Sequence, residues 1–153
     1  MSTVARNVVM QKILTLLSSV TFSSPINNAS TWVIPPSNKL RLWNNVDATQ
    51  QPCCFLVTHR ELDEYRGNGL RRRRLELGIW CYSRADNVSG ANDLDTMMEA
   101  FETVFAIQDD YSTGNNTLGG LVYFCRIEGK VFKDPGDLEG QTLLIVPLVV
   151  EMP

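Results

Sequence analysis

The sequence contains few of the residues from which catalytic and metal-binding sites are built. Among its 153 residues there is one histidine, His59, and the four cysteines lack Cys-x-x-Cys spacing. This inventory is too small for a zinc site. Glycine-rich phosphate loops, nucleophile elbows and metalloprotease helix motifs are also missing from the sequence. We therefore expect a protein that is not an enzyme, has no cofactor or metal, and acts through its surfaces.

Long apolar runs and a strong excess of either charge are missing as well. No apolar run approaches the roughly 20 residues that span a membrane, and the first residues lack the layout of a secretory signal. The formal net charge of -3 argues against a nucleic-acid clamp. We expect one domain over residues 1–153, no membrane contact, and reduced, buried thiols as in a cytoplasmic protein, at Cys53, Cys54, Cys81 and Cys125.

The last third of the chain predicts an antiparallel pair of strands. Two runs rich in Val, Ile, Tyr and Phe, 121–133 and 143–150, flank the turn sequence Asp134-Pro135-Gly136. Every residue of the second run is apolar except Pro147. Such a run indicates a strand covered on both faces. The cover is expected from two helices and, if these do not suffice, from another subunit.

Apolar stripes at helical spacing predict those two helices. The first covers Ser2 to Ser19, with Ser2 or Thr3 as the N-cap. The second begins at Asn92 or Asp93 and continues to about Ile107. Its buried stripe is expected at Leu94, Met97, Met98, Phe101, Val104 and Phe105.

The middle of the chain predicts a hairpin after a long irregular insert at 22–51. The insert is rich in Pro, Ser and Asn, and its tryptophans are expected to pack on the domain or to anchor a partner. Strands are expected at 53–59 and 71–82, joined by a charged loop at 60–70. At most one of Cys53 and Cys54 should be fully buried, because neighbouring strand residues face opposite sides. The predicted class is α+β: a four-stranded, mostly antiparallel sheet with two amphipathic helices, in the order α-β-β-α-β-β.

Four consecutive arginines, 71–74, are the most unusual local feature. In a strand, Arg71 and Arg73 share a face with Leu75, whereas Arg72 and Arg74 lie on the opposite face. Three interpretations remain open: a solvated strand end that protects an edge, ion pairs with another subunit, or contacts with phosphates of passing DNA. The candidate subunit- or partner-contact residues are Arg71, Arg72, Arg73, Arg74, Glu61, Asp63, Glu64, Lys130, Lys133, Asp134, Asp137 and Glu139.

Two chemical interpretations, a thiol dyad and a metal-binding loop, were also considered for these residues. Cys54 with His59 would be a thiol dyad of a small hydrolase, but a charged, exposed loop explains the surrounding residues better. Asp134, Asp137 and Glu139 lack the regular acidic spacing and the terminal bidentate Glu of a calcium loop.

The run Ile127-Glu-Gly-Lys-Val-Phe-Lys-Asp-Pro-Gly-Asp-Leu-Glu-Gly-Gln-Thr-Leu-Leu-Ile-Val-Pro-Leu-Val-Val resembles the end of small bacteriophage tail and neck proteins. Chain length and element order are similar to the tail terminator (tail completion) family of long-tailed phages. The resemblance implies a mixed α/β subunit that forms a hexameric ring, which caps the tail tube, ends its polymerisation and joins the tail to the head.

The resemblance also implies the partners and the location. The partners are further copies of the chain, the tail tube protein and a neck or head-completion protein, with DNA passing through the ring only in transit. The location is the virion, after assembly in the host cytoplasm. The alternative within this class is another neck ring subunit, such as a head-closure or connector protein.

Overall fold

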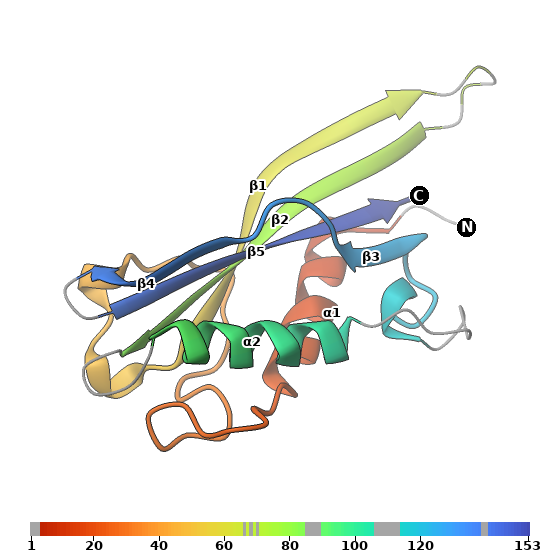
Figure 1. Ribbon diagram of the computed structural model, residues 1–153. Coiled ribbons are helices and arrows are strands. Elements are labelled where there is room, and N and C mark those ends of the chain that lie inside the picture. Colours follow the sequence, from red (N-terminus) through yellow and green to blue (C-terminus); the bar gives the residue numbers. More distant parts are fainter. Residues whose placement is uncertain are drawn as a thin grey trace.

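A computed structural model describes residues 4–65, 67, 69, 71–84, 90–105, 114–138 and 141–153. Within these residues the chain forms two α-helices, α1 (Arg6–Ser18) and α2 (Gly90–Val104), and five strands (Figure 1). The strands are β1 (Cys53–Tyr65), β2 (Arg71–Arg84), β3 (Phe124–Ile127), β4 (Phe132–Leu138) and β5 (Gln141–Met152). Short 3-10 helices occur at Trp43–Asn45, Ala48–Gln50 and Asn115–Thr117. The predicted α+β class with two helices is confirmed, but the predicted number and order of strands are wrong.

The sheet is antiparallel, and its far edge consists of two separate strands. The order is β1-β2-β5, and β3 and β4 both pair with β5, β3 with its last part and β4 with its first. The predicted single strand at 121–133 is therefore wrong. The edge breaks opposite Pro147, which has no N–H for a ladder. There Gly129 adopts φ +124°, and Glu128 N–H donates to the Pro147 carbonyl at 3.2 Å.

The turn predicted at Asp134-Pro135-Gly136 is also wrong, because these residues belong to β4. The register with β5 shifts between Asp134 and Leu138. Such an irregularity accommodates a proline, since a bulged residue needs no ladder hydrogen bond. The connection that follows β4, at 139–140, lies outside the described residues.

The hairpin of β1 and β2 is longer than predicted. Residues 60–65, expected in a loop, continue β1 opposite the arginines of β2, after a register shift between Thr58 and Arg60. Glu64 lies opposite Arg72 and Asp63 opposite Arg73. Opposite charges across neighbouring strands are favourable, so a charged sequence forms strand here.

Both helices pack on one face of the sheet, called here the helix face (Figure 1). In α1, Ala5 is the N-cap without a side-chain cap bond, and the predicted caps Ser2 and Thr3 lie outside the described residues. Helix α2 begins at Gly90, before the predicted cap, so that Asp93 lies in its first turn. The predicted end at Ile107 is outside the described residues.

The helix face forms the main core. Trp32 stacks on Phe101 of α2, with ring centroids 5.7 Å apart, and donates its indole N–H to the Leu17 carbonyl. The prediction that a tryptophan of the insert packs on the domain is therefore confirmed. The core side chains from α1, α2 and the strands include Val9, Ile13, Leu94, Met97, Leu77, Ile79, Val146 and Leu148, each at most 1% exposed.

The opposite face of the sheet, called here the outer face, carries a smaller core at one end. Cys53, Phe55 and Tyr82 are buried there beneath Val46 and its neighbours in the insert. Cys53 and Cys54 are both 0% exposed, so the expectation that only one would be buried is wrong. The reason is that the insert covers the outer face at the start of β1, while the helices cover the other face. Burial raises the pKa of the Cys53 thiol to about 12.

Candidate assembly surface

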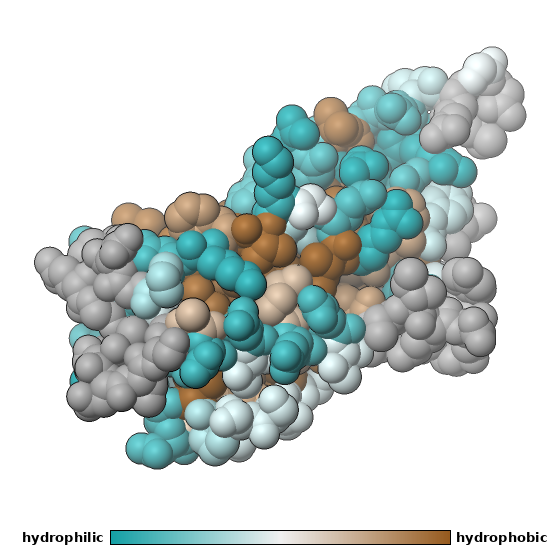
Figure 2. Space-filling model, viewed as in Figure 1, coloured by the Kyte–Doolittle hydropathy of each residue, from teal (hydrophilic) through white to brown (hydrophobic). Residues whose placement is uncertain are grey.

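The far end of the hairpin extends beyond both helices (Figure 1). We call this part the arm, defined as Arg60–Tyr65 of β1 and Arg71–Glu76 of β2. Figure 2 shows mostly hydrophilic residues along it. Leu62 and Tyr65 are exceptions, with 45% and 73% of their surface exposed. The arm thus presents a charged surface with isolated apolar side chains, and it carries seven of the predicted contact residues.

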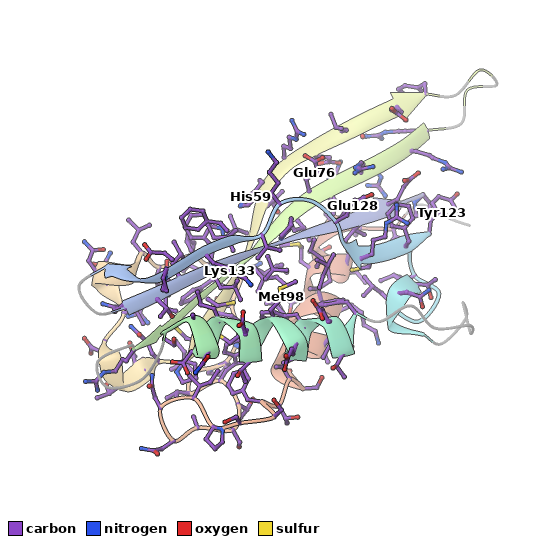
Figure 3. All side chains as sticks on the ribbon, viewed as in Figure 1. His59, Glu76, Met98, Tyr123, Glu128 and Lys133 are labelled. Carbon is purple, nitrogen blue, oxygen red and sulfur yellow. The ribbon has the colours of Figure 1, made fainter. Side chains whose placement is uncertain are left out.

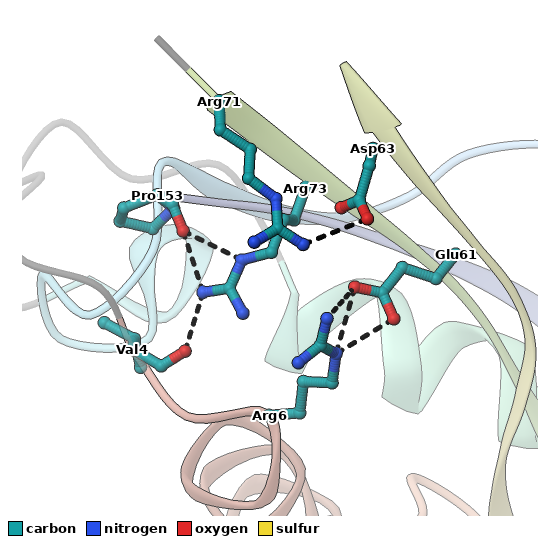
Figure 4. Close-up of polar contacts among 7 residues, drawn as sticks. All are labelled: Val4, Arg6, Glu61, Asp63, Arg71, Arg73 and Pro153. Carbon is teal, nitrogen blue, oxygen red and sulfur yellow. Dashed lines mark hydrogen bonds and ion pairs between the residues drawn. The ribbon is translucent and has the colours of Figure 1, made fainter. Parts of the chain in front are cut away.

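Arg73 faces the core and is only 3% exposed. Its Nη2 donates to the Val4 carbonyl at 2.7 Å and to the Pro153 main-chain oxygen at 2.8 Å (Figure 4). Its Nε donates to the same Pro153 oxygen at 3.0 Å. The guanidinium therefore joins the segment before α1 to the segment after β5. This arginine has a structural role within the chain.

Two further ion pairs lie on the same side of the arm. Arg71 donates to Asp63 at 3.0 Å, and Arg6 of α1 makes a bidentate contact with Glu61 at 2.6 and 2.9 Å (Figure 4). The Glu61 hydrogen bonds and charge raise the pKa of Arg6. Both pairs are substantially solvent-exposed, and exposed ion pairs add little to stability.

The outer face of the arm holds a second charged group. Arg72 pairs with Glu151 at 2.7 Å and lies over the Tyr123 ring, 5.2 Å from its centroid. Arg74 pairs with Glu128 at 3.1 Å. Glu76, Glu128 and Tyr123 of this group are labelled in Figure 3. As the alternation predicted, Arg72 and Arg74 share the face of Glu76.

Glu76 of this group pairs with both Arg60 and Arg74. Its hydrogen bond from Arg60, with the charges of Arg60 and Arg74, lowers the pKa of Glu76 below its ordinary value. A hollow of about 360 Å³ lies beside Glu76. Leu62 and several charged side chains line it. Its lining residues are Leu62, Glu64, Arg72, Arg74, Glu76 and Glu151.

The other predicted contact residues lie at the opposite edge of the sheet. Lys133 of β4 pairs with Asp95 of α2 at 3.2 Å, and Lys130 is exposed in the break before β4. Asp134 lies in β4, half-buried. The side chain of Asp137 and all of Glu139 are outside the described part of the chain. The predicted set is therefore not one patch but two groups at opposite edges of the sheet.

Sequence reasoning missed the partners that hold the arginines in place. Glu128 and Glu151 are separated from the arginines by more than fifty positions, and only the sheet register brings them together. It also missed the exposed apolar residues Leu62 and Phe132, of which Phe132 is 51% exposed. The position of Leu62, a large apolar residue within a charged segment, is the sequence signal that could have identified it as exposed.

The structure does not assemble the thiol dyad. Cys54 is buried in the helix-face core, and burial raises its pKa well above the ordinary value. His59 lies on the outer face, where its Nε2 accepts a hydrogen bond from the Trp80 indole N–H at 3.1 Å. It packs over Gly78, whose missing side chain leaves room for the imidazole. The sheet thus separates the two groups.

No protein-family model and no curated protein matches this chain. Within the described residues, no cluster of His, Cys, Asp or Glu is arranged to hold a metal ion. No helix in the same part of the chain is long and apolar enough to cross a membrane.

Proposed function

We propose that this chain is a structural virion protein of a long-tailed phage, which forms a ring that caps the tail tube, ends tube polymerisation and joins the tail to the head or neck. The observation that supports an assembling subunit most is the outer face beyond the insert. There Ile145 and Pro147 are only half-buried, and the neighbouring Phe132 is 51% exposed. Contiguous exposed apolar side chains are typical of interaction surfaces, and Phe132 and Ile145 are direct neighbours across β4 and β5.

The asymmetry between the two faces of β5 supports the same proposal. Thr142, Leu144, Val146, Leu148 and Val150 on the helix face are all 0% exposed. On the outer face, most of the residues that lie between these positions are half-buried. The continuous apolar run predicted cover on both faces, and the described residues cover one face fully and the other in part. A neighbouring subunit would supply the rest.

The arm is the second contact surface in this proposal. Its exposed ion pairs are weak, so these side chains can exchange partners when another surface approaches. The arginines pair with carboxylates of the same chain, as in Arg72 with Glu151 and Arg74 with Glu128. These pairs favour protein contacts over phosphate contacts, and they fit a ring that DNA only passes through.

The experiment that tests this proposal measures assembly directly. Light scattering over a wide concentration range, with and without tail tube protein, should give a ring mass in at least one condition, and negative-stain images should show rings. Rings should shorten tubes when added during tube polymerisation. A strict monomer in both conditions would contradict a terminator. Rings that bind a neck protein and leave tube length unchanged would favour the head-closure alternative.

A charge-reversal variant tests the arm within this proposal. Arg72→Glu with Arg74→Glu should leave a folded monomer that fails to form rings, because like charges at an interface cost several kcal/mol. Lys12→Glu with Lys39→Glu makes the same change of net charge at exposed positions away from the arm, and this control should assemble normally. Equal assembly of both variants would show that the arm is a solvated strand end.

A further inference from the structure

The second half of β1 is a free edge of the sheet. The strand β1 ends the strand order, and only near its beginning does the insert reach it, where Leu56 N–H donates to the Ser37 carbonyl at 2.8 Å. From residue 58 to residue 65, every position of β1 is exposed or half-buried, and this part lies beyond both helices (Figure 1). Within the described residues, no strand or bridge pairs with the edge there. Such an edge offers unpaired N–H and C=O groups to another strand.

The side chains of this edge are arranged symmetrically about Leu62. On the outer face, Arg60 and Glu64 lie two positions before and two positions after Leu62, with opposite charges. On the opposite face, Glu61 and Asp63 lie one position before and one position after it. Leu62 itself is 45% exposed. An antiparallel copy of the segment, centred on Leu62, therefore brings Arg60 of each copy opposite Glu64 of the other.

We propose that two copies of the chain pair through this edge, with β1 antiparallel to its counterpart and a two-fold axis at Leu62. The two sheets then continue as one sheet across the junction. The contact is isologous, because each copy contributes the same surface. It goes beyond the proposed ring, whose contacts are heterologous, and it does not depend on that ring.

The charges of the edge select this register. A two-fold axis perpendicular to the sheet brings one residue of the edge opposite its own copy, and like charges directly opposite each other are unfavourable. Within residues 60–65, only Leu62 and Tyr65 are uncharged. Tyr65 is the last residue of β1, so an axis there leaves most of the edge unpaired. An axis at Leu62 places two apolar side chains in contact, with an Arg60–Glu64 pair on each side of them.

Arg60 can bind a carboxylate of its own chain and one of the second copy at the same time. It donates to Glu76 of β2, and its side chain is nevertheless 69% exposed. A guanidinium has five N–H donors in a planar arrangement. Donors therefore remain for Glu64 of the second copy.

The carboxylates on the opposite face have cations of their own. Arg6 donates to Glu61 at 2.6 and 2.9 Å, and Arg71 donates to Asp63 at 3.0 Å (Figure 4). In the proposed register, Glu61 of one copy lies opposite Asp63 of the other. Each such pair of carboxylates is accompanied by two guanidinium groups, so the charge on this face is balanced as well.

Cysteine cross-linking tests the position of the axis. The four native cysteines are buried, so an introduced thiol reports selectively. Leu62→Cys should give a covalent dimer under a mild oxidant, because the axis brings each new thiol opposite its own copy. Tyr65→Cys is the control. Position 65 is more exposed, at 73%, but its two copies lie about 20 Å apart along the strands in this register, so this variant should give no dimer.

Charge reversal tests the cross-strand pairs. In the Leu62→Cys background, Arg60→Glu and Glu64→Arg each place like charges opposite each other when a variant pairs with itself. The dimer yield of either variant alone should therefore fall by roughly tenfold. A mixture of the two variants restores opposite charges at both pairs, and we expect a mixed dimer at the yield of Leu62→Cys alone. Circular dichroism of each variant confirms the fold before mixing.

The outcomes separate this inference from the proposed function. Equal dimer yields from Leu62→Cys and Tyr65→Cys would indicate random collisions and overturn the edge contact. A mixture that forms no more dimer than either charge variant alone would overturn the Arg60–Glu64 pairs and, with them, the register. Rings whose Leu62→Cys thiols form no dimer would overturn edge pairing and leave the proposed ring intact. A Leu62→Cys dimer without rings in any condition would support edge pairing and contradict the ring.

Discussion

Replacing Arg73 by methionine should destabilise the folded chain far more than the same change at Arg71. The two residues are two positions apart in one run of arginines. Arg73 is 3% exposed, whereas the side chain of Arg71 is 43% exposed. Methionine retains much of the apolar volume of either side chain, so the comparison isolates the guanidinium contacts.

The magnitude follows from the hydrogen bonds that are lost. Arg73 donates three times to two main-chain oxygens, those of Val4 and Pro153. Hydrogen bonds from a charged group contribute about 1.5–3 kcal/mol each. Removal of the buried charge recovers part of its desolvation cost. A net loss of about 2–4 kcal/mol results, against about 0–1 kcal/mol for the exposed pair of Arg71 with Asp63.

Urea unfolding followed by circular dichroism measures both values, at a concentration where light scattering gives a monomer. For a domain of this size, 1 kcal/mol corresponds to about 2–4 °C, so Tm should fall by roughly 4–16 °C for Arg73→Met. Equal losses for the two variants, within about 0.5 kcal/mol, would refute the assignment of Arg73 as the residue that joins the segments at Val4 and Pro153.

Three further perturbations follow from local geometry. Gly129→Ala should cost about 1–2 kcal/mol, because φ is +124° and a Cβ would meet Pro147 at 3.2 Å. Gly67→Ala is the control and should be neutral, because the space around Gly67 is open. Equal urea midpoints for the two variants would contradict the prediction for Gly129. Cys54→Ser buries a hydroxyl and should cost about 1–3 kcal/mol while rings still form; ring loss in a folded variant would revive a thiol function. Because Arg60 lowers the pKa of Glu76 from 4.5, the stabilisation by this carboxylate is present above pH 4.5 and is lost as the pH falls through its lowered pKa. Glu76→Gln should therefore flatten the acid limb of stability against pH, and an unchanged limb would oppose this assignment.

The candidate surface could be predicted only in part from the sequence. Alternation along a strand correctly placed Arg72 and Arg74 on the face of Glu76, because side-chain direction in a strand is a local property. Their partners could not be predicted in the same way. Glu151 reaches Arg72 through the β2–β5 register, and Glu128 reaches Arg74 from the broken edge.

Errors at the termini of elements also have a common cause. The charged sequence at 60–65 is typical of a loop when considered alone, and it forms strand because the arginines of β2 lie opposite. Asp134-Pro135-Gly136 is typical of a turn, and it belongs to β4 because β5 supplies a partner on one side. In both places tertiary pairing outweighs local preference.

The sequence by itself determined the α+β class, the two helices, the β1–β2 and β5 strands, and the burial of most of the apolar stripe of α2, in which Met98 and Val104 are only half-buried, because periodicity and side-chain chemistry are local. Only the tertiary structure decided what depends on contacts between distant segments. It divided the last edge into β3 and β4 around Pro147 and Gly129, and it buried Cys53 beneath the insert. It also separated Cys54 from His59 and sent Arg73 into the core, since register and layer packing fix which distant side chains meet.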